Sequence, residues 1–325
     1  MKRAYILVIL LICICLPAFS SGNRDSRGVD GKITVTATIF PPYDFTRAIA
    51  GDRVNLNMLL PPGAESHSYE PSPRDIISIQ RSDVFIYIGG ESDSWVDRIL
   101  NSMDTKNMKI IRLMDAVDVV EEEIVEGMEE EYEEAEAALE AIGASGEEEP
   151  EYDEHIWTSP RNAALMARAI AEGLSEKDKT NAEFYRKNTD AYTARLDELD
   201  AAFRQVVSGA KRRTIVFGDR YPFRYFSDAY GLSYFAAFPG CSTETEPSAA
   251  TVAFLINKIR AENIPVVFHI ELSNEKMADT IAEETGAKKR LLHAVHNISK
   301  RDFDNGATYL DSMTLNVDTL REDLW

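Results

Sequence analysis

Short runs of β-branched and aromatic residues alternate with segments of helical spacing along most of this 325-residue chain. The runs with a strand pattern are residues 33–40, 54–60, 83–90, 213–219, 232–240, 264–272 and 288–295. A chain in which strands and helices alternate in this way buries its strands in a mostly parallel sheet with helices packed against it. The alternation therefore indicates an α/β protein.

The alternation is interrupted by one purely helical region. From Pro160 to Val207 apolar residues recur at helical spacing, and no strand pattern occurs. We therefore expect one long, rigid helix over 171–208, which joins an N-terminal lobe (32–170) to a C-terminal lobe (209–325). The length of the chain also favours two domains. The predicted fold class is α/β, with two lobes of mostly parallel sheet flanked by helices.

The first 20 residues have the features of a signal peptide. Two basic residues precede an apolar core (5–16) that is too short to cross a bilayer as a helix. Residues 21–31 are polar and Gly-rich, and we expect them to form a linker. The protein is therefore predicted to be exported, to a periplasmic or other extracytoplasmic location. The alternative is a lipoprotein anchor on a cysteine of the signal, although isoleucine precedes both candidates where a small residue is expected.

The net charge of −20 is concentrated in an acidic insertion of the N-terminal lobe, residues 119–154. Between residues 121 and 154, 17 of the 34 residues are Asp or Glu, and none is Lys or Arg. The other 38 acidic residues nearly balance the 35 Lys and Arg. Because no basic surface can follow a phosphate backbone, nucleic acid is not an expected partner. Two interpretations of the insertion remain open: carboxylates that capture metal ions loosely, or a disordered, solubilising segment.

Four of the five histidines are predicted to reach the cleft between the lobes. His67 follows the second strand, His155 precedes the helical region, and His293 and His296 follow the last strand. Ligands of open α/β sheets bind outside the carboxyl ends of the strands, so these imidazoles can converge there. A set of imidazole ligands suits zinc. The fifth, His269, lies inside a strand and is expected to be a hydrogen-bonded core residue.

Three carboxylates near these histidines are candidates for orienting an imidazole or for serving as an additional oxygen ligand: Glu65, Asp219 and Glu271. Asp219 has a second interpretation, as the cap of the helix that follows it. Cys241 is the only cysteine outside the predicted signal peptide, and we expect it to be neither a nucleophile nor a ligand. The sequence contains no HExxH, GxSxG, GxxxxGK[ST] or GxGxxG motif, so no enzyme is predicted. A zinc hydrolase remains a weaker alternative.

Several motifs together resemble one family. They are PPGAESHSYEPSPRD (61–75), EHIWTSPRNA (154–163), YFSDAYGL (225–232) and FHIELSNEKMADTIAEETGA (268–287). These segments closely resemble the metal-binding solute receptors of zinc and manganese ABC transporters. The resemblance implies a monomer of two α/β lobes that holds a metal ion between them with little domain closure and delivers it to a membrane permease. It implies zinc as the ion; the alternatives are a manganese or iron receptor and a metal-dependent adhesin of the same fold.

One ligand position of the family departs from the pattern. His67 and His155 match ligand positions, but the third, a His or Glu in the family, falls on Gly218, which has no side chain. The acidic fourth ligand of the family falls at or beside His293. We therefore predict a zinc site of His67, His155 and His293, with His296 as a fourth ligand or as a neighbour that orients one. The spacing of three between the last two histidines allows both to face one side if a helical turn follows the strand.

Overall fold

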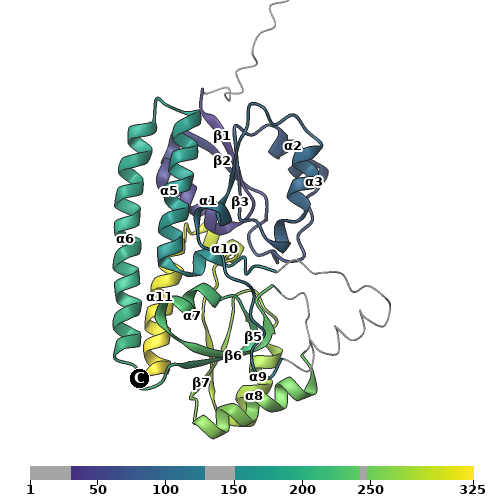
Figure 1. Cartoon of the computed structure of the whole chain (residues 1–325), viewed down its shortest axis with the longest axis vertical. Coiled ribbons are helices and arrows are strands. Elements are labelled where there is room, and N and C mark those ends of the chain that lie inside the picture. The colour runs from purple at the N-terminus through teal and green to yellow at the C-terminus, as the bar shows by residue number, and fades with distance from the viewer. Residues whose placement is uncertain (1–30, 129–150, 242–246) are drawn as a thin grey trace, which may run out of the picture.

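The computed structural model describes residues 31–128, 151–241 and 247–325. The predicted signal peptide, the linker up to residue 30 and residues 129–150 of the acidic insertion lie outside these ranges. Each half of the molecule contains a four-stranded, fully parallel sheet (Figure 1). The predicted α/β fold class is confirmed.

The two sheets repeat one topology. The first has the order β2-β1-β3-β4 and the second has the order β6-β5-β7-β8. The strands of the first sheet are β1 (Ile33–Ala37), β2 (Val54–Met58), β3 (Val84–Tyr87) and β4 (Lys109–Arg112). Those of the second are β5 (Thr214–Tyr221), β6 (Ser233–Pro239), β7 (Val266–His269) and β8 (Lys288–Leu291). In both sheets the chain order reverses at the central strands, and ligands of such sheets bind at the carboxyl edge near that point.

Helices surround both sheets (Figure 1). The first half contains α1 (Phe40–Ala50), α2 (Pro73–Gln80) and α3 (Trp95–Asn101). The second half contains α7 (Arg224–Tyr230), α8 (Ala249–Glu262), α9 (Lys276–Thr285), α10 (Lys300–Asp304) and α11 (Tyr309–Leu324). Short 3-10 turns lie at η1 (Gly51–Arg53), η2 (Glu91–Asp93), η3 (Leu113–Ala116) and η4 (Ile156–Thr158). Across the described ranges, none of the helices combines the length and the apolarity needed to cross a membrane.

The first lobe differs from the sequence predictions at two places. The strand expected over 33–40 ends at Ala37, and α1 begins at Phe40 with Pro41 and Pro42 in its first turn. Proline is tolerated there because its fixed φ suits a helix and the N–H it lacks would have no helical partner. Strand β4 was not predicted. It is short, with two isoleucines between Lys109 and Arg112, and it is an edge strand that pairs only with β3 within its sheet.

The connection between the lobes consists of two antiparallel helices, where one helix over 171–208 was expected. Helix α5 (Pro160–Lys177) ends in a turn, and α6 (Ala182–Ser208) follows it. The Asp178 carboxylate stabilises the turn by accepting hydrogen bonds from the Asn181 amide (2.6 Å) and the Tyr185 hydroxyl (2.8 Å). Helix α6 is about 40 Å long at 1.5 Å per residue. It contacts α1 of the first lobe and α7 and α11 of the second, so it joins the two lobes (Figure 1).

One buried cluster of apolar side chains is shared by both lobes. Phe45 of α1 and Tyr309 of α11 pack edge to face, with ring centroids 5.0 Å apart. The Tyr309 hydroxyl donates to the carbonyl of Trp157 (2.6 Å), and the Trp157 indole donates to the carbonyl of Ala294 (2.7 Å). Both contacts cross between the lobes beside His155. The interface that carries the site is therefore packed and hydrogen-bonded.

Candidate metal centre

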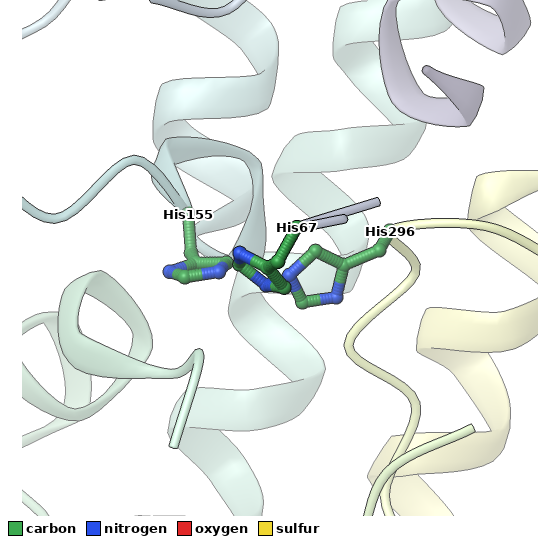
Figure 2. A group of neighbouring side chains, drawn as sticks. All are labelled: His67, His155 and His296. Carbon is green, nitrogen blue, oxygen red and sulfur yellow. The ribbon is translucent and has the colours of Figure 1, made fainter. Parts of the chain in front are cut away.

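Three histidines meet between the lobes. His67 lies in the loop after β2, His155 immediately precedes η4, and His296 lies in the loop after β8. One ring nitrogen of each lies within 4.8 Å of the corresponding nitrogen of the other two. The ring centroids are 5.6 Å (67–155), 5.2 Å (67–296) and 4.6 Å (155–296) apart. Figure 2 shows the three rings turned toward a common centre.

All three rings have a buried nitrogen without a partner. The Nε2 atoms of His67, His155 and His296 are shielded from solvent and have no hydrogen-bond partner in the described part of the chain. A buried polar atom without a partner is costly, and three within one small group are unusual. Their lone pairs can bind one cation together. The geometry and the chemistry of these donors therefore fit a divalent metal ion.

Asp153 orients His155. Its Oδ1 atom accepts from the backbone N–H of His155 (2.7 Å) and from the ring Nδ1–H (2.9 Å). The Nδ1 atom therefore carries the proton, which leaves Nε2 as the acceptor that faces the other histidines. Burial lowers the pKa of His155, but the charge and hydrogen bond of Asp153, with the charges of Glu154 and Glu122, outweigh burial and raise it.

Glu154 orients His67 through Ser92. The Glu154 carboxylate accepts from the Ser92 backbone N–H (3.0 Å) and from the Ser92 hydroxyl. The Ser92 oxygen lies 3.1 Å from Nδ1 of His67. It accepts a hydrogen bond from Nδ1–H, because the hydroxyl of Ser92 donates its own hydrogen to Glu154. Gly90, at φ 87°, makes this contact possible: a Cβ there would lie 2.8 Å from Cβ of Glu154. The last two acidic residues of the insertion thus each support one histidine.

Glu271 holds the loop that presents His296. Its carboxylate accepts from the backbone N–H groups of Ala294 (2.7 Å) and His296 (3.1 Å). Between them Val295 has a φ of 62°, a left-handed conformation that is strained for a β-branched residue. Burial raises the pKa of Glu271 to about 7, although the hydrogen bonds from the backbone oppose this.

The loop of His296 is also joined to the loop of His67. The Asn297 amide donates to the carbonyls of Pro61 (2.8 Å) and Ala64 (2.9 Å). The backbone N–H of Gly63 donates to the carbonyl of Ile298 (2.9 Å). The two loops come from different lobes, so these bonds set the distance between the histidines.

The remaining two histidines do not join this group. His293 was predicted as a ligand, but its backbone N–H donates to Oδ1 of Asn316 in α11 (2.8 Å), and its ring lies outside the three-histidine group. The expected helical turn after β8 does not form, because Val295 is left-handed, and so His293 and His296 do not share a face. His269, expected in the core, is 8% exposed, with Nδ1 3.1 Å from the carbonyl oxygen of Ile270.

Asp219 and Glu65 make other contacts. Asp219 lies within β5, and its carboxylate accepts from the backbone N–H of Ile270 (3.1 Å), so it links β5 to the end of β7. The expected helix cap is wrong, because α7 begins after Phe223 without a side-chain cap. Glu65 accepts from the backbone N–H of His67 (3.2 Å), and its other oxygen lies 3.3 Å from the guanidinium of Arg220.

Gly218 is not replaceable without a shift of α9. A Cβ at this position would lie 2.6 Å from Cα of Ala278, which belongs to the backbone of α9. The helix therefore occupies the space that a side chain at 218 would need. The ligand position that the sequence lacks is closed in the structure as well, and His296 supplies a nitrogen from the other side of the site.

Cys241 lies near two further groups of ligand-type atoms. It combines with Glu154 and His155 in one group, and with Glu122 and Glu151 in the other, each within 4.8 Å. The Cys241 backbone N–H donates to Glu122 (2.8 Å). Burial, with the negative charges of Glu154 and Glu122, raises the pKa of the thiol. Cys241 is not a member of the group formed by the three histidines, so it is not assigned to the centre.

Comparison with known proteins places the chain in a family. The family model described as zinc-uptake complex component A, periplasmic (ZnuA), matches residues 35–323. The chain belongs to the ZnuA family. The high-affinity zinc uptake system protein ZnuA of Bacillus subtilis is 32% identical over 97% of this chain and 94% of its own length. Members of this family are transport receptors rather than enzymes.

Two further ZnuA-family comparisons concern one relative. The zinc-binding lipoprotein AdcA of Streptococcus pneumoniae is 30% identical over 99% of this chain, which spans 61% of AdcA. The crystal structure of the Zn(II)-bound ZnuA-like domain of AdcA has a TM-score of 0.72 at 28% identity and covers 90% of this chain and 99% of that domain. The family resemblance seen in the sequence motifs is confirmed.

The orienting residues were missed at the sequence level. Asp153 and Glu154 were interpreted as the end of a charged run, and Ser92 was not considered. A signal for them exists: the two acids directly precede His155, and Ser92 lies two residues after Gly90, the second of two consecutive glycines. Glycines at the end of a buried strand permit the close approach that Glu154 makes.

Proposed function

We propose that this protein is the extracytoplasmic receptor of a zinc ABC transporter. It binds one Zn²⁺ ion through the Nε2 atoms of His67, His155 and His296 and delivers it to a membrane permease. The observation that carries the proposal is the convergence of three buried imidazole nitrogens that have no other partner. The names of the relatives, a zinc uptake protein and a zinc-binding lipoprotein, support it.

The ligand set favours zinc over manganese. The three converging atoms are all imidazole nitrogens, and the nearby carboxylates of Asp153 and Glu271 already accept hydrogen bonds from N–H groups. Manganese prefers oxygen ligands, whereas imidazole suits zinc. Because two histidines come from the first lobe and His296 comes from the second, the ion is held between the lobes. Release to a permease then requires only a small separation of the two loops.

The test is metal binding to the refolded apoprotein. We expect one zinc ion per chain and an affinity for zinc at least about 100-fold higher than for manganese, from the preference of imidazole. Competition with a chelating fluorophore measures both constants. Equal affinities, or tighter binding of manganese, would contradict the assignment of zinc.

A second prediction concerns the protons released on zinc binding and the pH dependence of the zinc affinity. The pKa of His155 is raised, whereas the pKa of His67 is lowered to about 3 by burial, His155 and Arg220, and burial lowers the pKa of His296 as well. Zinc binding to Nε2 must displace the second proton of His155 wherever that ring is protonated, so affinity should fall about tenfold per pH unit below the pKa of His155, with about one proton released per ion in that range. Calorimetry in buffers of different ionisation enthalpy measures the number released.

Asp153→Asn provides the control for this prediction. Without the carboxylate, the largest contribution that raises the pKa of His155 is lost, so the pH below which zinc affinity falls should move down while zinc still binds. Release of two or three protons by the native protein would show that His67 or His296 is also protonated.

A further inference from the structure

The three converging atoms of the centre are imidazole nitrogens, which carry no negative charge and leave a fourth position of the metal open. Zinc sites are usually tetrahedral, and those with three protein ligands keep an open fourth position. In the described ranges no carboxylate or thiol belongs to the group of three nitrogens. The side chain that Gly218 lacks cannot be supplied there either, because α9 fills its place.

A small cavity opens on one side of the centre. It has a volume of about 20 Å³ and is lined by His67 and His296 but not by His155. That volume suits a single water-sized ligand atom. The same cavity is lined by Glu65, Arg220 and Leu272, which also line a second, larger cavity of about 640 Å³. The open side of the metal centre therefore faces Arg220 and leads into the larger space.

Arg220 places a permanent positive charge at the junction of the two cavities. Its guanidinium pairs with Glu65 of the other lobe at 3.3 Å, and its side chain is 15% exposed. The planar guanidinium has five N–H donors and binds carboxylates in a bidentate manner, through two parallel hydrogen bonds. A zinc ion held by neutral imidazoles beside this group brings two more positive charges. An anion at the fourth position would interact favourably with both and offset part of this charge.

The larger cavity has room for a small molecule. Its volume lies within the range of small-ligand pockets, and it is far larger than a bare ion requires. It is lined by the loop between β7 and α9 and by Lys276 at the start of α9. Two carboxylates on its wall already have partners: Asp219 accepts from Ile270 (3.1 Å), and Glu275 pairs with Lys289 (2.7 Å).

We propose that the fourth zinc ligand is an oxygen of a small carboxylate anion that is bound with the metal, with its carboxylate on Arg220 and its body in the larger cavity. The substrate is then a zinc–carboxylate complex rather than the bare ion. This inference rests on the proposed zinc-binding function. Glu65 and Glu271 are the rivals, because both line the same small cavity and either could turn its own carboxylate to the metal.

Cobalt-loaded protein tests the inference, because the visible spectrum of Co²⁺ reports changes in its coordination. Acetate and citrate are titrated into protein that holds one Co²⁺ ion. We expect a saturable spectral change with both, and tighter binding of citrate because it also fills the larger cavity. Arg220→Gln should weaken anion binding by about tenfold or more, the usual weight of a charge-assisted hydrogen bond. Glu65→Gln, the matched control at the other end of the ion pair, should retain or strengthen anion binding.

Three results would overturn the inference: an unchanged spectrum at all anion concentrations, equal anion binding by the native protein and Arg220→Gln, or a four-coordinate spectrum that Glu65→Gln alone abolishes. The last would assign the fourth position to Glu65. Stoichiometric cobalt binding and the unfolding temperature of each variant are measured first. Failure of the native protein to bind the metal would contradict the proposed function itself, whereas stoichiometric binding with an unresponsive spectrum contradicts only the anion.

Discussion

Replacing His67 or His296 with alanine is expected to lower zinc affinity by about 1,000-fold or more. Structural zinc sites have apparent binding free energies of about 10–16 kcal/mol, so the loss of one of three protein ligands removes several kcal/mol. Competition with a chelator of known affinity measures the loss. His155→Ala should have an effect at least as large, but it also removes a fully buried ring and the partner of Asp153, so part of its cost falls on the fold.

His293→Ala is the matched control, because it changes the same residue type three positions from His296. Its ring lies outside the group of three nitrogens, so zinc affinity should change by less than about threefold, the scale of a surface substitution. The unfolding of each apoprotein is followed by circular dichroism to separate loss of a ligand from loss of the fold. A large effect of His293→Ala together with a small effect of His296→Ala would restore the ligand set that the sequence alone suggested.

The two lobes and their parallel sheets were predictable because strand and helix patterns alternate over the whole chain. The hydrophobic pattern of a segment indicates which of its residues are buried, and it predicted seven of the eight strands of the two sheets. The turn between α5 and α6 was not predicted, because it depends on one carboxylate, Asp178, that bonds Asn181 and Tyr185. A local side-chain bond of this kind leaves no periodic signal.

The centre was predictable in part. Motif resemblance pointed to His67 and His155, and the missing side chain at Gly218 pointed to the last strand for a replacement. The choice between His293 and His296 required the backbone of the loop, which is decided by the left-handed Val295 and by Glu271 from the loop after β7. A valine in that conformation contradicts its local preference, so no pattern within the loop could have predicted it.

Glu271→Ala is expected to lower zinc affinity by about 100-fold without removing any ligand, the upper range for residues that orient metal ligands. The carboxylate accepts hydrogen bonds from the N–H groups of Ala294 and His296, and the carbonyl of Ala294 accepts one from the indole N–H of Trp157 (2.7 Å). Without it these buried donors lose their acceptor, and we expect the apoprotein to lose about 2–3 kcal/mol of unfolding free energy as well. Glu271→Gln keeps one acceptor oxygen, so its zinc affinity and its unfolding free energy should lie between those of the native protein and Glu271→Ala.

Val295→Gly tests whether the left-handed residue of the loop contributes to zinc binding. Glycine adopts a φ of 62° without strain, but it also removes a buried side chain of the core, so the apoprotein should unfold at a lower denaturant concentration while it remains folded in buffer. The same freedom lets the loop leave the conformation that presents His296, so zinc should dissociate faster and bind about tenfold more weakly, the lower range for such positions. Stopped-flow transfer of zinc to a chelator measures the rate. Unchanged dissociation in Val295→Gly, with normal folding, would show that Glu271 alone positions His296 and that the strained residue contributes nothing to binding.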